Sequence, residues 1–125
     1  MKLHLTTAEN NHLITAYDTH FIEINKQKIG GSLLVMPQQL IKDWGVASFA
    51  TLNEAHIEKI AEFNPEVVLL GTGEKHQFLH PNMTNSLTIK GIPLECMTTV
   101  AACRTYNILM SEGRNVLAAL IVENS

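Results

Sequence analysis

A glycine-rich turn is the first candidate for chemistry in this sequence. Gly71-Thr72-Gly73-Glu74 directly follows an apolar run, and closely spaced glycines after a strand can bring backbone amides up to a phosphate. A dinucleotide-binding fingerprint needs a third glycine, but that position holds His76. Glu95 lies near the spacing of a ribose-binding acid, yet within an expected strand rather than at its end. We favour a tight turn without ligand; a small anion held by the turn's amides is the alternative.

Histidine and cysteine side chains offer two further candidates, a metal pair and a nucleophile. His76 and His80 have the i, i+4 spacing of a helical metal pair, but no glutamate occupies the position that a hydrolytic zinc site requires. Pro81 also disfavours helical geometry at His80, so we expect no metal site. Cys103 could have a lowered pKa near a helix N-terminus, yet it falls on an apolar helical face. We expect a core cysteine, no catalytic residue and no cofactor.

Polar side chains that follow expected strands form a candidate ligand site. Thr98 and Thr99 follow one strand, as Gly71–Gly73 follow another. Ligands of open α/β sheets bind at the carboxyl ends of parallel strands, and Arg104 would add a forked donor suited to a carboxylate or phosphate. The candidate site therefore consists of Gly71, Thr72, Gly73, Thr98, Thr99 and Arg104. Alternatively, the threonines cap a helix and the segment has only structural roles.

The elements that would position these residues alternate along the C-terminal half. Strands are expected from short apolar runs at 66–71, 92–97 and 115–122. One helix is expected before them, from a capping box formed by Thr51 and Glu54 up to Pro65. Two more are expected between them, from Pro81 to Gly91 and from Thr98 or Thr99 to Gly113. This order predicts an α/β sheet covered by helices, with right-handed crossovers between parallel strands.

The N-terminal third has the pattern of antiparallel strands instead. Residues 13–17 and 21–25 flank a short polar break, and their alternation predicts a hairpin. Residues 32–36 are continuously apolar, which is typical of a strand buried on both faces. Residues 37–50 show no assignable pattern, although Trp44 is expected to pack in the core or at its edge.

Composition bounds the class of protein. A chain of 125 residues that is 46% hydrophobic and 17% charged has the make-up of one globular domain, residues 1–125. The net charge of −3, without a basic cluster, disfavours nucleic acid and anionic membrane surfaces as partners. No apolar run approaches the roughly 20 residues of a membrane-spanning helix. Met1–Thr6 lacks the apolar centre of a signal peptide, and two cysteines form no disulfide framework. We expect a cytoplasmic protein.

Several motifs, taken together and in order, resemble a known family over nearly the whole chain. They are Ile29–Leu34, Val67–Gly73, Gly91-Ile92, Met97–Asn107 and Glu112–Leu120. The sequence is similar to the family that contains mitochondrial respiratory complex I assembly factor 3 and many small bacterial and archaeal proteins. The resemblance implies a three-layer α/β fold, in which helices flank a mixed central sheet with additional N-terminal antiparallel strands. It implies no established enzymatic activity and, in mitochondrial members, a scaffold that pairs with another assembly factor.

Two functions of different classes follow. The first is a non-catalytic protein-binding module, an assembly or maturation factor for a respiratory membrane complex, with a protein partner. The second is a small-molecule binding protein or enzyme that takes an anionic metabolite in the crevice at the strand ends. Homodimerisation is compatible with either function, but the sequence shows no surface for it.

Overall fold

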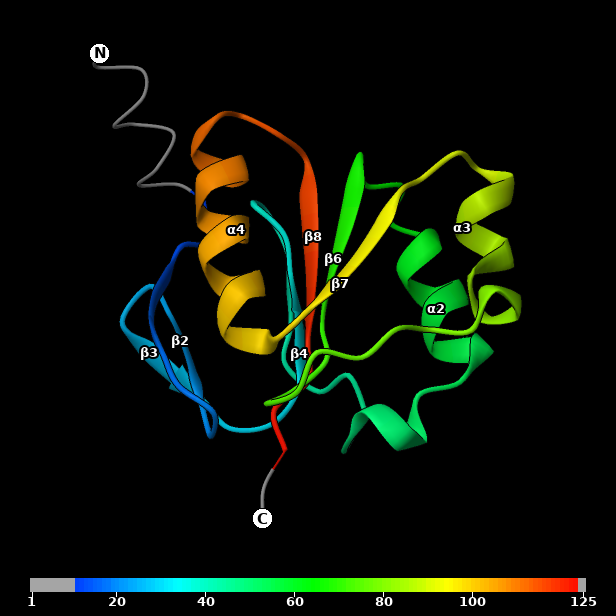
Figure 1. The fold of residues 1–125 in the computed structure, drawn as a ribbon. Helices are drawn as coiled ribbons and strands as arrows, with labels where there is room; N and C mark the ends of the chain where they lie inside the picture. Colours follow the sequence, from blue (N-terminus) through cyan, green and yellow to red (C-terminus); the bar gives the residue numbers. More distant parts are fainter. Residues whose placement is uncertain (1–10, 124–125) are drawn as a thin grey trace.

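Residues 11–123 are described by the computed structural model, and Figure 1 shows them arranged as a central sheet between two outer layers. Helix α4 (Thr99–Ser111) and a small antiparallel sheet cover one face. Helices α2 (Glu54–Ala61) and α3 (Asn85–Ile89) cover the other. The three-layer α/β fold implied by the resemblance is confirmed. Within the described range no helix is long and apolar enough to cross a membrane. The prediction about a signal peptide concerned Met1–Thr6, which lie outside that range.

The central sheet is mixed, with the strand order β5-β4-β8-β6-β7. Its strands are β4 (Leu33–Val35), β5 (Leu40–Ile41), β6 (Val67–Gly71), β7 (Leu94–Met97) and β8 (Val116–Leu120). Strand β6 pairs in parallel with β7 and with β8, whereas β4 runs antiparallel to β8 and to β5. The expected C-terminal strands are confirmed with shorter bounds, and β5 falls in the segment that had no assignable pattern.

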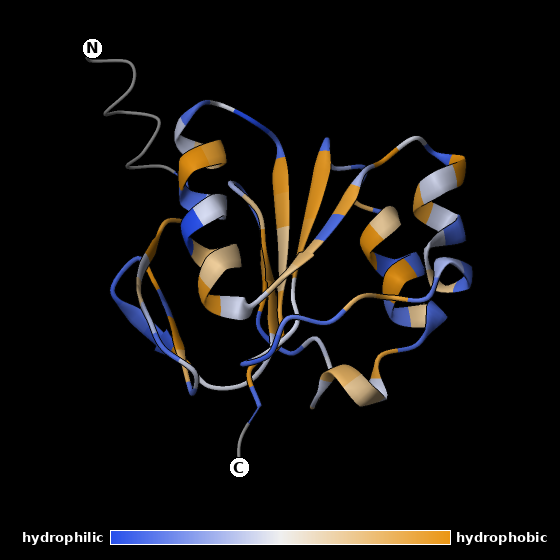
Figure 2. Cartoon of the chain, in the orientation of Figure 1, coloured by the Kyte–Doolittle hydropathy of each residue, from blue (hydrophilic) through white to orange (hydrophobic). Residues whose placement is uncertain are grey.

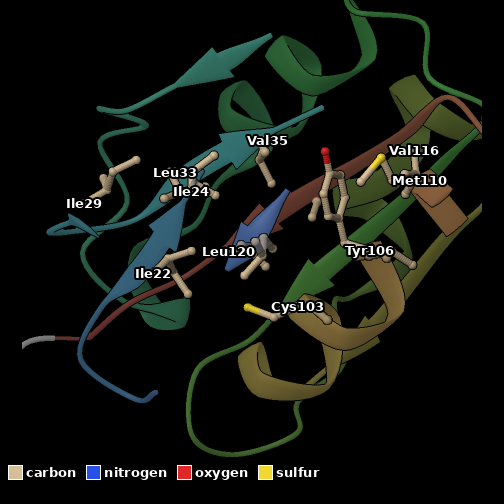
Figure 3. Packing of buried hydrophobic residues seen from close by; sticks show 14 of the residues in the cluster. Ile22, Ile24, Ile29, Leu33, Val35, Cys103, Tyr106, Met110, Val116 and Leu120 are labelled. Atoms are coloured by element: carbon tan, nitrogen blue, oxygen red, sulfur yellow. The ribbon is translucent and has the colours of Figure 1, made fainter. Parts of the chain in front are cut away.

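Each central strand alternates between two hydrophobic cores. On β6, Val67 and Leu69 join the core beneath α4, whereas Val68 and Leu70 join the core beneath α2. This two-residue period explains why a strand buried on both faces is continuously apolar. In Figure 2 strands β6 and β8 are among the most hydrophobic parts of the chain. Figure 3 shows the core on the α4 side, where Tyr106 packs among side chains of the central sheet and of the small sheet.

The N-terminal sheet consists of β1 (Ile14–Tyr17), β2 (Ile22–Ile24) and β3 (Gln27–Ile29), paired antiparallel in that order. The predicted hairpin is confirmed, and β3 is an additional strand. Between β2 and β3 the chain turns through Asn25 and Lys26, with φ of 49° and 73°. Two left-handed residues are what a two-residue hairpin turn requires. Glycine usually supplies such residues, so the pair Asn25-Lys26 carries no recognisable sequence signal for this turn.

Helix α4 holds the small sheet by side-chain hydrogen bonds to its backbone. The Asn107 amide donates to the carbonyl of Ile14 at 2.8 Å, and its oxygen accepts the N–H of Ile14 at 3.0 Å. The hydroxyl of Tyr106 donates to the carbonyl of His12 at 2.8 Å, and burial raises the pKa of that hydroxyl well above its usual value. These contacts fix the β1–β2 hairpin relative to α4.

The predicted capping box of helix α2 is wrong. Its N-cap is Asn53, two residues after the predicted Thr51. Thr51 ends a short 3-10 helix (Phe49–Thr51), and Leu52 is extended. Asn53 is the N-cap: its side chain accepts the N–H of His56 at 3.2 Å, and the His56 Nδ1 accepts the N–H of Asn53 at 3.0 Å. Histidine thus takes the role that the pattern assigned to glutamate.

The expected helix from Pro81 to Gly91 is two shorter pieces. A 3-10 helix (Pro81–Thr84) precedes α3, which ends at Ile89. The hydroxyl of Thr88 donates to the carbonyl of Thr84 at 3.1 Å, a competing bond of the kind that weakens helices rich in hydroxyl residues. Proline lies in the first turn as expected, and Gly91 follows α3 with φ of 71°.

Candidate functional site

The carboxyl end of β6 is a topological switch point. The chain leaves β6 for β7 by way of α3, which packs on one face, and leaves β7 for β8 by way of α4, which packs on the other. Neighbouring connections therefore diverge there, as at the ligand sites of open α/β sheets. A cavity of about 540 Å³ opens at this point. It is lined by Thr19, His20, Gly73, Glu74, Thr98, Thr99, Val100, Ile121 and Glu123.

Gly71 lies beneath this cavity, where the start of α4 packs directly on β6. A Cβ on Gly71 would come within 2.9 Å of the Thr99 Cα, 3.0 Å of the Thr99 Oγ1 and 3.2 Å of a Leu120 methyl. Glycine is therefore needed for the close approach of helix to strand. This contact agrees with the favoured interpretation of the turn as a structural feature.

Two of the three backbone amides expected to face a ligand donate within the protein. The N–H of Thr72 donates to the carbonyl of Met97 at 2.8 Å, and the N–H of Gly73 donates to the Thr99 Oγ1 at 2.9 Å. The buried hydroxyl of Thr72 donates to the carbonyl of Lys75 at 2.6 Å. The turn is thus closed by its own hydrogen bonds, and residues 71–73 present few free donors to the cavity.

The remaining predicted residues separate into two groups. Thr98 is the N-cap of α4 and accepts the N–H of Ala101 at 3.3 Å, so the predicted capping role is confirmed. Thr99 is buried and donates to the carbonyl of Ile121 at 2.7 Å. Arg104 is exposed and does not line the cavity. The structure therefore brings Gly73, Thr98 and Thr99 to one cavity, with Gly71 and Thr72 beneath it, and places Arg104 outside.

The cavity contains acidic groups that the sequence analysis missed. Glu74 and Glu123 line it, and a Cβ on Gly73, whose φ is 102°, would come within 3.0 Å of the Glu123 carboxylate. Glu123 follows β8, so the same strand-end rule could have found it. Thr19 and His20 come from the β1–β2 hairpin, and no local pattern connects them to this site. With two carboxylates and no arginine, the lining opposes an anionic ligand.

Nucleophile and metal candidates have structural roles in the described residues. Burial raises the pKa of the Cys103 thiol to about 12, so this side chain is a core cysteine as predicted. The ring of His76 lies 4.5 Å from that of Phe78, and the His80 Nδ1 accepts the N–H of Asn82 at 3.2 Å. Across residues 11–123, no three His, Cys, Asp or Glu side chains gather as metal ligands.

Curated relatives are similar to most of this chain. A Xenopus tropicalis protein called NADH dehydrogenase [ubiquinone] 1 alpha subcomplex assembly factor 3 is 33% identical over 110 residues. The match covers 86% of this chain and 60% of that protein. The chain therefore spans less than two thirds of the length of this relative.

Solved structures match the fold closely. A crystal structure of a Bordetella parapertussis protein superposes with a TM-score of 0.85 at 35% identity, covering 90% of this chain and 97% of the other. The solution structure of a Bordetella pertussis protein, described as a Mth938-like domain, gives a TM-score of 0.81 at 29% identity and covers 91% and 87% of the two chains.

The resemblance seen in the sequence motifs is confirmed by these matches. A family model described as "Protein of unknown function (DUF498/DUF598)" matches residues 14–121, which include every described helix and strand. The motifs at 29–34, 67–73, 91–92, 97–107 and 112–120 all lie inside that range. On these grounds the chain belongs to the DUF498/DUF598 family.

Proposed function

We propose that this protein is a non-catalytic binding module that acts as an assembly or maturation factor for a respiratory membrane complex. The observation that carries the proposal is the similarity, over 86% of the chain, to a relative named as an assembly factor of NADH dehydrogenase. The chemistry of the described residues agrees with it. The Cys103 thiol is buried with a pKa of about 12, and the turn at 71–73 uses its donors internally.

The surface also offers large apolar side chains for contact with a protein. Phe78, Ile89 and Ile108 are 77%, 84% and 57% exposed. Single exposed apolar residues are common, but Phe78 lies beside a groove lined mostly by apolar residues. Apolar surface gathered in one place marks sites of protein contact more often than scattered residues do.

The proposal is tested in the organism that carries the gene. In a deletion strain we expect less fully assembled respiratory complex on native gels and an accumulation of subcomplexes, both restored by a wild-type copy. A tagged copy should retain a protein of the same pathway in near-stoichiometric amount. Normal assembly in the deletion strain, measured under respiratory growth, would contradict the proposal.

A second candidate function, small-molecule binding, is favoured by the cavity of about 540 Å³ at the switch point of the sheet. We expect a small molecule bound there to raise the melting temperature of the wild type and of Arg104→Ala, because Arg104 does not line the cavity. Val100→Trp, which fills the cavity, should abolish the shift. A metabolite whose effect requires Arg104 and survives Val100→Trp would place the ligand elsewhere and contradict this site.

A further inference from the structure

Strand β7 is an edge of the central sheet, because among the described strands it pairs only with β6. In Figure 1 it lies in front of β6 and β8. The carbonyl of Pro93 accepts the N–H of Val68, and that of Met97 accepts the N–H of Thr72. Backbone groups of alternate residues on a strand point to opposite sides. The N–H and C=O groups of Leu94 and Cys96 therefore point outward from the sheet.

These outward backbone groups lack partners within the described residues. No hydrogen bond there engages the N–H or the carbonyl of Leu94 or Cys96. An unpaired edge of this kind is a template for another extended chain. Natural proteins often block such edges with a covering helix or loop. Here Leu79 and Cys96 line the same groove, and no loop among the described residues forms a hydrogen bond with the backbone of Leu94 or Cys96.

An apolar groove of about 540 Å³ runs beside the same edge. Its apolar lining includes Leu87 from α3, Leu94 and Cys96 from β7, and the exposed ring of Phe78. A strand added to β7 would direct every second side chain toward this groove, on the face where Leu94 and Cys96 lie. The groove thus provides pockets for apolar side chains of an added segment, and β7 provides its backbone partners.

The negative charge of Glu95 favours a basic residue in the added segment. Glu95 is the one charged residue of β7, it is exposed, and it has no ion-pair partner in the described range. A cationic side chain directly across from it on an added strand is favourable. A second copy of this chain is disfavoured in the antiparallel register centred on Glu95, since two carboxylates would then face each other.

We propose that β7 accepts an extended segment of a partner protein as an added strand. That segment alternates apolar residues, which enter the groove, with outward residues, and it carries lysine or arginine across from Glu95. The inference rests on the proposed function as a protein-binding module, and it names the surface and the chemistry of the partner.

The test selects short random peptides by display on the purified full chain and measures the affinity of the synthesised winners. We expect enrichment of peptides that alternate apolar residues and contain a basic one. Cys96→Pro removes an outward N–H without breaking the ladder to β6 and should weaken binding about tenfold. Cys96→Val keeps the N–H, loses the thiol equally and should bind like the wild type. Glu95→Lys should weaken the binding of peptides that contain a basic residue about fivefold. Thermal melts verify that each variant is folded.

Several results would overturn the edge as the binding surface. They are the absence of any enriched peptide, equal binding by Cys96→Pro and Cys96→Val, and a wild-type dimer that Cys96→Pro converts to monomer, which would make a second copy the occupant. The deletion strain separates this inference from the proposed function. An assembly defect without selective peptide binding at β7 would contradict only the proposal that β7 accepts an added strand. Selective binding at β7 without an assembly defect would contradict only the proposed role in assembly.

Discussion

Gly71→Ala is expected to destabilise the fold by about 1–3 kcal/mol and to lower the melting temperature by about 4–12 °C. The added methyl would lie 2.9 Å from the Thr99 Cα, a backbone atom that a side-chain rotation cannot move. Relief requires helix α4 to shift away from β6. Because α4 also holds β1 through Asn107, the strain would reach the small sheet as well. Thermal and urea denaturation of the purified variant measure the effect.

Gly30→Ala is the matched control for this prediction. A Cβ at Gly30 meets no atom within 4 Å, so the same chemical change should alter stability by less than about 0.5 kcal/mol. Equal stability of the two variants would show that the start of α4 does not press on β6 at Gly71. The tight turn at residues 71–73 would then need another explanation.

The main strands and helices could be predicted from the sequence because their signals are local, whereas the three layers and the mixed sheet were implied only by the family resemblance. Continuous apolar runs such as 67–71 and 116–120 identify strands buried on both faces, and the intervening helices imply crossovers. Sequence patterns failed to predict a cap or a turn where an uncommon residue occupies the position. His56 completes a capping box in place of glutamate, and Asn25-Lys26 makes a turn that usually contains glycine.

Only the part of the candidate site that follows the ends of parallel strands could be predicted from the sequence. The rule that loops after parallel strands meet at one edge grouped Gly73, Thr98 and Thr99, and all three line one cavity in the structure. It could not bring in His20, because the docking of a distant hairpin depends on tertiary contacts of α4. Arg104 follows the buried Cys103 on the helix and therefore points away from the core, which removes it from the cavity.

Thr99→Val is expected to cost about 2–4 kcal/mol, because it leaves two buried backbone groups without hydrogen bonds. The Thr99 Oγ1 accepts the N–H of Gly73 at 2.9 Å and donates to the carbonyl of Ile121 at 2.7 Å. One hydroxyl thus connects the turn after β6, the first turn of α4 and the chain after β8. Valine matches the shape of threonine but has neither donor nor acceptor. Thermal denaturation measures the loss of stability, and amide hydrogen exchange at Gly73 locates it.

Thr99→Ser separates the hydroxyl from the methyl. Serine keeps both hydrogen bonds and loses one methyl, so its cost should be about 1 kcal/mol, with the N–H of Gly73 still protected from exchange. If the valine and serine variants were equally stable, the hydroxyl would contribute nothing, and Thr99 would act only by filling space beneath the cavity. If valine alone deprotects Gly73, three strand ends far apart in the sequence are held in register by this one buried oxygen, and the floor of the cavity depends on it.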